Sequence, residues 1–234
     1  MQLGYSQAYR ERGLDGDKLE RLSVLGDMLR NAGLNVTGIR EPEAIERFHF
    51  LDCLSLQEIP EVRSAKRIAD LGSGAGLPAL VLALTLPGAM VTAVESLRKK
   101  CVFIEKAAFA MELENLEVRG ARAEEYGLGS GRAAHDLAVS RALAALPVVI
   151  EYSLPLLREG GSVVAMKGAI SNDERIHAQK ALDILGGGEL RSTKLVPFPG
   201  AENRWVYIAK KVGPTPAQYP RRPGLAARRP LGGS

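Results

Sequence analysis

The sequence predicts an α/β fold with a mostly parallel, doubly wound sheet, an antiparallel hairpin at one sheet edge and an N-terminal helical extension. Three observations carry this prediction. Strand-like apolar runs alternate with helix-period segments in the middle of the chain, a glycine-rich turn follows the first run, and only helical periodicity precedes it. At 234 residues the chain can hold one such domain with an appendage. We expect a helical extension over 1–62, the α/β domain over 63–211 and a basic Pro/Arg-rich tail over 212–234.

The helical extension is expected to hold two helices. Asp15 or Asp17 can cap the first, and Pro42 suits the first turn of the second. Apolar residues recur at helical spacing in both: Leu19, Leu22, Leu25 and Leu29 in the first, and Ile45, Phe48 and Leu51 in the second.

The α/β domain is expected to alternate strands with helices. Strands are expected over 67–71, 89–95, 116–118, 135–140, 161–167, 189–196 and 204–210, and helices over 78–86, after Ser96, over 144–157 and over 171–186. Ser171 to Glu174 forms a capping box, and Gly186 is suited to the end of that helix. Because the last two strands have no helix between them, they indicate an antiparallel hairpin.

The turn after the first strand predicts a nucleotide site. Gly72, Gly74 and Gly76 allow a ligand to approach the backbone, at the start of a helix whose first N–H groups are unpaired. Glu95 ends the next strand, where a carboxylate can accept hydrogen bonds from ribose hydroxyls. This context is typical of a Rossmann-like fold.

The details of the turn favour S-adenosylmethionine (SAM) over a dinucleotide. Leu77 stands where the dinucleotide pattern G-x-G-x-x-G needs its third glycine. The carboxylate of Asp70 would repel a pyrophosphate but attract the ammonium and sulfonium groups of SAM. An aspartate at a strand end can also simply cap the following turn. We interpret the domain as a Rossmann-like SAM-dependent methyltransferase fold.

At these residues the sequence resembles the RsmG family, also called GidB, which methylates N7 of a guanine in bacterial 16S ribosomal RNA, near the decoding site. The resemblance spans nearly the whole chain and lies in seven motifs: Asp70 to Pro78, Glu95 to Leu97, Arg122 to Glu125, Ser140 to Ala142, Met166 to Gly168, Asn35 to Thr37 and Phe48 to Asp52. The chain departs from the family at Phe48, Cys53 and Ala79, where the family usually has arginine, serine and glycine.

The resemblance implies contacts with SAM at seven residues: Gly72, Leu77, Glu95, Ser96, Ala123, Glu124 and Arg141. A backbone N–H at Ala123 or Glu124 could meet the adenine edge, although these residues could also form a plain surface loop. Arg141 follows the fourth strand at the ligand edge of the sheet, where it could equally make a structural salt bridge.

The chemistry around the turn fits guanine N7, which has a free lone pair and needs no deprotonation. Cytosine C5 would need a cysteine nucleophile, but Cys101 lies on the apolar face of a helix and Cys53 lies in the extension. The Pro-Pro motif of exocyclic-amine methyltransferases is missing after the fourth strand, where Ser140 to Leu143 stand. We therefore expect no catalytic acid or base, no metal site, and catalysis by alignment at roughly 3–3.5 Å.

The expected partner is 16S rRNA or the small ribosomal subunit. No acid follows Glu202, and seven basic residues do, whereas the chain before them has 24 basic and 27 acidic residues. The candidate RNA contacts are His49, Lys167, Tyr219, Arg221 and Arg222. Each has an alternative: helix packing for His49, a SAM carboxylate contact or plain solvation for Lys167, and a solvated, disordered tail for the others.

Composition indicates a cytoplasmic protein. Only two cysteines occur, and no signal peptide is visible. The uncharged stretch 71–94 is interrupted by glycines and by Pro87, so we expect no membrane span. Two other classes stay open: a methyltransferase for small molecules or proteins, and a non-catalytic RNA-binding protein with a vestigial nucleotide fold.

Overall fold

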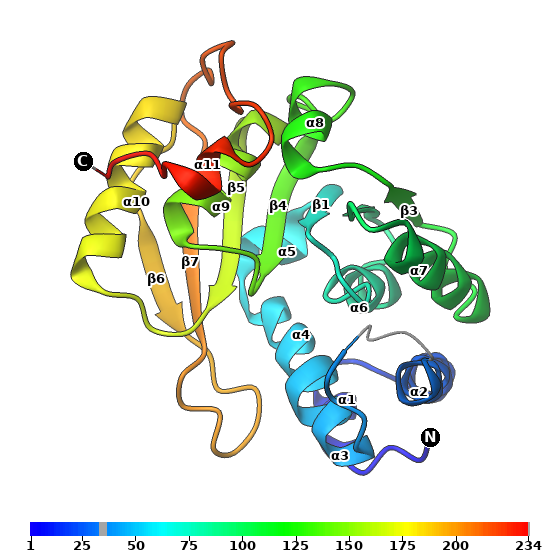
Figure 1. Cartoon of the computed structure of the whole chain (residues 1–234). Coiled ribbons are helices and arrows are strands. Elements are labelled where there is room, and N and C mark those ends of the chain that lie inside the picture. The colour runs from blue at the N-terminus through cyan, green and yellow to red at the C-terminus, as the bar shows by residue number, and fades with distance from the viewer. Residues whose placement is uncertain (33–36, 234) are drawn as a thin grey trace.

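The computed structural model describes residues 1–32 and 37–233 and contains a seven-stranded sheet in the order β3-β2-β1-β4-β5-β7-β6 (Figure 1). Strands β1 to β5 run parallel, and β7 is antiparallel to both β5 and β6. The doubly wound sheet and its antiparallel edge hairpin are therefore confirmed. The strands are β1 (Arg67–Leu71), β2 (Met90–Val94), β3 (Leu116–Arg119), β4 (His135–Arg141), β5 (Leu157–Lys167), β6 (Arg191–Lys194) and β7 (Trp205–Lys210).

Helices cover both faces of this sheet. One layer contains α6 (Ala79–Thr85) and α7 (Arg98–Ala110), and the other contains α8 (Ala123–Leu128), α9 (Leu146–Ser153), the 3₁₀ turn η3 (Leu154–Leu156) and α10 (Asn172–Leu185). Side chains alternate between these layers, as a doubly covered strand requires: Leu137 and Val139 of β4 join one core cluster, and Ala138 joins another.

Helix ends follow the sequence rules in most places. Ser171 Oγ accepts a hydrogen bond from the Glu174 amide at 3.1 Å, and Gly186 ends α10 with φ 82°. The predicted capping box is only half formed, because Glu174 Oε1 accepts from the Leu146 amide at 2.7 Å instead of returning to Ser171. The exception is Ser96, which does not cap the helix that follows it: α7 begins at Arg98, after Leu97, and without a side-chain cap. The Leu97 amide, just before the helix, donates to Glu95 Oε1.

The N-terminal residues form the expected helices, but the second is broken into several turns. They are α1 (Ser6–Glu11), α2 (Gly16–Asn31), α3 (Pro42–Ile45), the π-helix η1 (Glu46–Leu51), α4 (Asp52–Leu54), the 3₁₀ turn η2 (Ser55–Glu58) and α5 (Pro60–Ser64). Asp15 caps α2 by accepting from the Lys18 amide. The motif residues Asn35 and Val36 lie outside the described part of the chain.

These N-terminal helices lie below the carboxyl ends of the strands. In Figure 1, β4 and β5 point down toward them. Within them, the buried Glu46 carboxylate accepts from the Gly4 amide at 2.9 Å and from the Tyr9 hydroxyl at 3.0 Å. Arg141, the last residue of β4, joins them to the sheet by donating to the Phe48 carbonyl oxygen at 2.9 Å. The extension therefore covers the sheet edge at which ligands bind in doubly wound folds.

The C-terminal residues pack onto the domain. Ala226, in α11 (Leu225–Arg228), is buried beside Tyr126 and Tyr152. Arg132 donates to the carbonyl oxygens of Thr215 and Tyr219 at 3.0 and 2.7 Å. The alternative of a solvated, disordered tail is therefore wrong for the described residues of this segment. Two of its backbone carbonyls accept hydrogen bonds from Arg132, and the Ala226 side chain is buried against α8 and α9.

No helix of the described ranges 1–32 and 37–233 is both long and apolar enough to cross a membrane. The uncharged stretch 71–94 divides into the glycine turn, α6 and β2.

Candidate active site

The glycine turn between β1 and α6 has the backbone that its sequence demands. Gly72 has φ +66°, and a Cβ atom there would lie 2.5 Å from the Leu143 side chain. Gly76 has φ +81°, and its Cβ would lie 2.5 Å from Leu80. Only glycine fits both the conformation and the space. Gly72 therefore allows close approach at the site, whereas Gly76 serves the packing of α6.

The side chain of Glu95 is hydrogen-bonded to this turn. It is 6 % exposed; its Oε2 accepts from the Gly74 amide at 2.9 Å and its Oε1 accepts from the Leu97 amide at 2.8 Å. Each carboxylate oxygen has a further lone pair, so both can still accept a hydrogen bond from a ligand hydroxyl.

A cavity of about 350 Å³, named here the Glu95 cavity, lies beside this carboxylate. It brings together five of the residues predicted to bind the cofactor: Gly72, Glu95, Ser96, Ala123 and Glu124. The C-terminal wall of this cavity was not predicted from the sequence. Ala227 lines the cavity, and the Gly224 amide donates to Glu124 Oε1 at 2.8 Å. No pattern in residues 212–234 signalled this contact, because it depends on the chain folding back.

The carboxylate of Asp70 lies beneath the turn and lines neither the Glu95 cavity nor the cavity on the other side of the turn. Its side chain is fully buried; Oδ2 accepts from the Ala79 amide at 3.2 Å, and Oδ1 has no partner among the described residues. Burial raises the pKa of Asp70 to about 6, although the Ser73 hydroxyl, the hydrogen bond from Ala79 and the charge of Arg141 oppose that rise. Oδ2 therefore caps the turn, as the alternative interpretation of Asp70 predicted, and Oδ1 is a buried acceptor without a partner among the described residues.

A second cavity, of about 480 Å³ and named here the Arg141 cavity, lies on the other side of the turn. It contains the predicted residues Gly72, Gly74, Leu77, Arg141, His49 and Lys167. Gly72 and Ala142 line both cavities. Ala142 has φ +50°, a conformation that costs a non-glycine residue energy and that often marks functional sites. The two cavities therefore meet at the glycine turn.

Arg141 and Arg204 share one carboxylate in this cavity. Asp52 Oδ2 lies 3.4 Å from Arg141 Nη1, and Asp52 Oδ1 accepts from Arg204 Nε at 3.0 Å. Arg141 also donates to the Phe48 carbonyl oxygen at 2.9 Å. The structural salt bridge that the sequence left open therefore exists, and it ties the extension to β4 and β7. Neither Asp52 nor Arg204 was among the predicted site residues, although Asp52 ends one of the seven motifs.

His49 is buried and has both ring nitrogens engaged. Nε2 lies 2.8 Å from the Thr37 hydroxyl, and Nδ1 lies 3.1 Å from the Phe48 carbonyl oxygen. Burial, together with the charge of Arg141, lowers the pKa of His49 to about 4, so the ring is neutral at pH 7.

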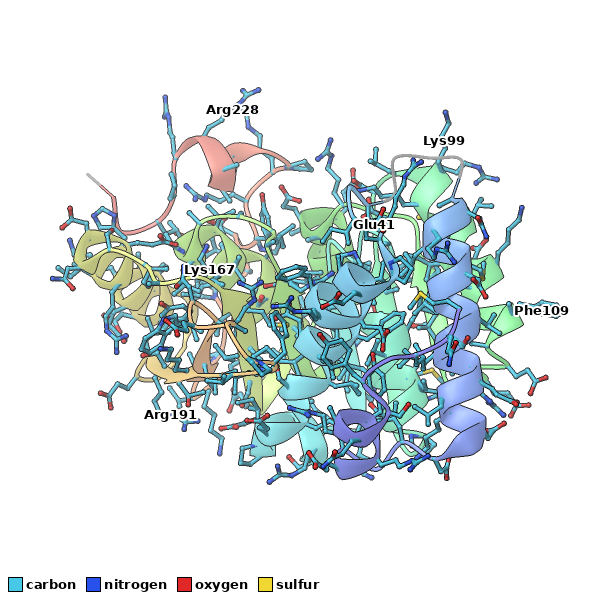
Figure 2. The ribbon with its side chains drawn as sticks, turned by 90° about the horizontal axis from the view of Figure 1, so that it is seen from below. Glu41, Lys99, Phe109, Lys167, Arg191 and Arg228 are labelled. Carbon is cyan, nitrogen blue, oxygen red and sulfur yellow. The ribbon has the colours of Figure 1, made fainter. Side chains whose placement is uncertain are left out.

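Lys167 is the last residue of β5, and Figure 2 shows it between α10 and the N-terminal helices. Its Nζ donates to the Ala144 carbonyl oxygen at 2.6 Å and lies 3.3 Å from Glu174 Oε1. It is partly buried, so the alternative of a freely solvated lysine is wrong.

Two of the three tail residues predicted to contact RNA have partners within the fold. Arg221 is paired with the fully buried carboxylate of Glu151, through Nε at 2.8 Å and Nη2 at 2.5 Å. Tyr219 packs against a core cluster. Arg222 alone of the three is exposed. The guanidinium of Arg221 is therefore used inside the fold, because Glu151 would otherwise be a buried charge without a counter-ion.

Comparison with known proteins identifies the family. The model of GidB, described as rRNA small subunit methyltransferase G, matches residues 20–197. The chain belongs to this family. Ribosomal RNA small subunit methyltransferase G of Desulfitobacterium hafniense is 38% identical over 222 residues, which cover 93% of this chain and 91% of the relative. The enzyme of the same name from Moorella thermoacetica is 41% identical over 202 residues, 86% of this chain and 84% of the relative.

Membership of the GidB family confirms the predicted class, a SAM-dependent rRNA methyltransferase, and its cofactor. Solved structures agree on the fold. A SAM-dependent O-methyltransferase from Thermotoga maritima is similar with a TM-score of 0.57 at 18% identity, over 82% of this chain and 72% of that one. The SAM-dependent methyltransferase SibL is similar with a TM-score of 0.59 at 15% identity, over 84% of this chain and 70% of that one.

The residues of the Glu95 cavity fit SAM on their own chemistry. Gly72 lines the cavity at the turn, Glu95 offers two acceptor oxygens, and Asp70 has one buried oxygen without a partner among the described residues. Among the described residues, no cluster of three His, Cys, Asp or Glu side chains is arranged to hold a metal ion. Which residues touch the cofactor stays a prediction.

Proposed function

We propose that this protein transfers the methyl group of SAM to N7 of a guanine in 16S rRNA, at a position near the decoding site. Asp70, Gly72, Gly74, Leu77, Glu95, Ser96, Ala123, Glu124 and Arg141 would hold the cofactor, and the Arg141 cavity would take the base. When bound, SAM supplies an electrophilic methyl group. Gly76 is left out of this set, because it lines neither the Glu95 cavity nor the Arg141 cavity.

The observation that carries the proposal is the state of the titratable groups in the Arg141 cavity. His49 is neutral at pH 7 and both of its nitrogens are engaged. The carboxylate of Asp52 faces two guanidinium groups. Among the described residues, then, every candidate for a general base in this cavity is already occupied. Guanine N7 suits such a site, since its lone pair attacks without losing a proton, whereas an exocyclic amine must lose one.

The chain's own residues would therefore act by orientation and charge. The Asp52 pairs hold Arg141 and Arg204 in place. Lys167, fixed by Ala144 and Glu174, presents one positive charge to the same cavity. Arg204 and Lys167 would meet base oxygens or phosphates of the RNA, as arginine and lysine do in nucleic-acid sites. Of the other RNA candidates, Arg222 remains available for phosphate contact, and His49 serves by packing against Thr37.

Labelled SAM and small ribosomal subunits that lack the modification test the proposal. We expect one methyl group in 16S rRNA, recovered as 7-methylguanosine after nuclease digestion and mass spectrometry. A methyl group on another atom would overturn the N7 assignment. Label found only in protein or in small molecules would instead favour the alternative methyltransferase class.

The pH dependence of the chemical step gives a second test. Because His49 has a pKa of about 4, we expect single-turnover methyl transfer with saturating SAM to stay flat from about pH 7 to about pH 9. His49→Gln should lose less than about ten-fold in rate, whereas loss of a general base typically costs 10²–10⁴-fold. A rate that rises with pH, together with a large loss in the variant, would indicate a base.

A further inference from the structure

One aromatic side chain at the Arg141 cavity has no role in the chemistry described so far. Phe48 lines this cavity and is 36 % exposed. Its ring meets the buried ring of Phe198 edge-on, with centroids 5.3 Å apart and an interplanar angle of 87°. Part of the ring therefore faces the cavity and is accessible to a ligand there, beyond what it contributes to the contact with Phe198.

Two guanidinium groups stand around this ring. The central carbon of Arg47 lies 5.6 Å from the Phe48 ring centroid, and that of Arg204 lies 6.0 Å from it. Acidic partners hold both: Glu43 lies 3.6 Å from Arg47, and Asp52 accepts from Arg204 at 3.0 Å. The ring thus has two cations beside it: Arg204 is held by the buried carboxylate of Asp52, whereas Arg47 makes an exposed ion pair and lies closer still to Phe198, at 4.9 Å from that ring's centroid.

The backbone of Phe48 is fixed independently of its side chain. The residue lies in the π-helix η1, and its carbonyl oxygen accepts from Arg141 Nη1. A change of side chain at this position therefore leaves the Arg141 contact in place. Phe198 and Leu195 of the segment between β6 and β7 are buried on the same side, so the ring sits on a packed base.

We propose that Phe48 is a stacking platform for a nucleobase of the rRNA substrate at the entrance of the Arg141 cavity, with Arg47 and Arg204 meeting the adjacent phosphates. The inference rests on the proposed function in that the ligand is RNA. An aromatic face next to guanidinium groups is the combination that binds splayed single-stranded bases. Loss of such a stack weakens binding by about ten- to a hundred-fold.

The single tryptophan of the chain offers a direct readout. Trp205 lines the same cavity, so its fluorescence reports occupation of the cavity without any methyl transfer. Titration with unmodified 16S rRNA then gives a dissociation constant for each variant, and steady-state methylation gives KM and kcat separately. Calorimetry with SAM reports the cofactor site.

Three substitutions separate stacking from packing. Phe48→Leu keeps an apolar side chain against Phe198 but removes the aromatic face, Phe48→Tyr keeps the face, and Phe48→Ala removes both. We expect the Leu and Ala variants to raise the Kd and KM for rRNA by about ten- to a hundred-fold, with SAM affinity unchanged, and the Tyr variant to stay within about three-fold of the wild type. Phe109→Leu is the matched control, because Phe109 projects from α7 (Figure 2) and is 87 % exposed, away from both cavities.

A Phe48→Leu variant that binds and methylates rRNA like the wild type would overturn the stacking role. So would equal losses of SAM and rRNA affinity in the Leu variant, since the ring would then support the cofactor site. If Phe48→Ala fails to fold, the Leu and Tyr variants decide. If the wild type methylates an atom other than N7, the proposed function fails, while the rRNA titration still decides on Phe48.

Discussion

Asp70 is the residue at which stability and cofactor binding conflict. Its buried Oδ1 has no partner among the described residues, so the ionised form is costly without a ligand. The same negative charge suits a ligand that carries an ammonium and a sulfonium group. We infer that this carboxylate is kept for the cofactor at the expense of the unliganded fold.

Asp70→Asn should therefore stabilise the unliganded protein and weaken SAM binding. The pKa of Asp70 is about 6 in the folded protein, above its ordinary value of 3.8. The free energy of unfolding therefore falls as the pH rises from 3.8 to about 6, and the full loss is reached above pH 6. Two pKa units correspond to about 3 kcal/mol at most, and we expect a gain of about 1–3 kcal/mol in the free energy of unfolding at pH 7. The gain should vanish near pH 4.

Urea unfolding at several pH values and calorimetry with SAM check both parts. Glu114→Gln, at an exposed carboxylate, is the control and should change neither quantity. An Asn variant that is less stable at pH 7, or one that binds SAM as tightly as the wild type, would contradict this account of Asp70.

At the scale of elements, the turn between β1 and α6 determines where the ligand can approach. Gly72→Ala places a Cβ 2.5 Å from Leu143 and forces a positive φ on a residue that has a Cβ. We expect a loss of about 1–2 kcal/mol in stability from the backbone and at least a ten-fold loss of SAM affinity from the displaced Leu143.

Gly160 supplies the matched control for this turn. It has φ +84° in β5, and a Cβ there would meet nothing within 4 Å. Gly160→Ala should lose comparable stability and keep the wild-type SAM affinity. Equal SAM affinities for the two variants, measured by calorimetry, would show that Gly72 is needed only for its backbone.

The elements also differ in how well the sequence predicts them. Parallel strands such as β1 and β4 are buried on both faces, so continuous apolar runs predicted them nearly to the residue. The helix from Pro42 was predicted as one element, but its residues 46–51 form a π-helix. The spacing of apolar residues cannot distinguish an α-helix from a π-helix over six residues. The residues of η1 also make tertiary contacts that the sequence does not show: the Phe48 carbonyl accepts from Arg141, and the Glu46 carboxylate accepts from the Gly4 amide.

On the scale of the whole molecule, the C-terminal segment closes one side of the cofactor site. Arg221 neutralises the buried Glu151 of α9, and Ala227 lines the Glu95 cavity. We expect Arg221→Ala to lose about 3–5 kcal/mol of stability, because it leaves Glu151 as a buried, uncompensated charge. SAM affinity should fall with it, as the wall of the cavity loosens.

Arg222→Ala separates the two roles of this basic segment. Arg222 is exposed, and Figure 2 shows the nearby Arg228 projecting from the molecule. This variant should keep the wild-type stability. It should reduce the slope of log Kd for rRNA against log salt concentration by about 1, the contribution of one phosphate contact. Thermal unfolding and RNA titrations at several salt concentrations measure both. A stable Arg221→Ala variant, or an unchanged salt slope for Arg222→Ala, would contradict this division.

The sequence by itself determined the fold class, the glycine turn and the acid at Glu95, because backbone geometry and strand periodicity are local properties that specific residue types report. The tertiary structure decided what those residues touch. It buried Asp70, paired Arg141 and Arg204 through Asp52, and turned Arg221 from a candidate RNA contact into a structural ion pair. The physical reason is that the role of a charged side chain depends on which partners lie beside it in the folded chain. Glu151 and Arg221 are seventy positions apart in the sequence and come together only when the domain folds.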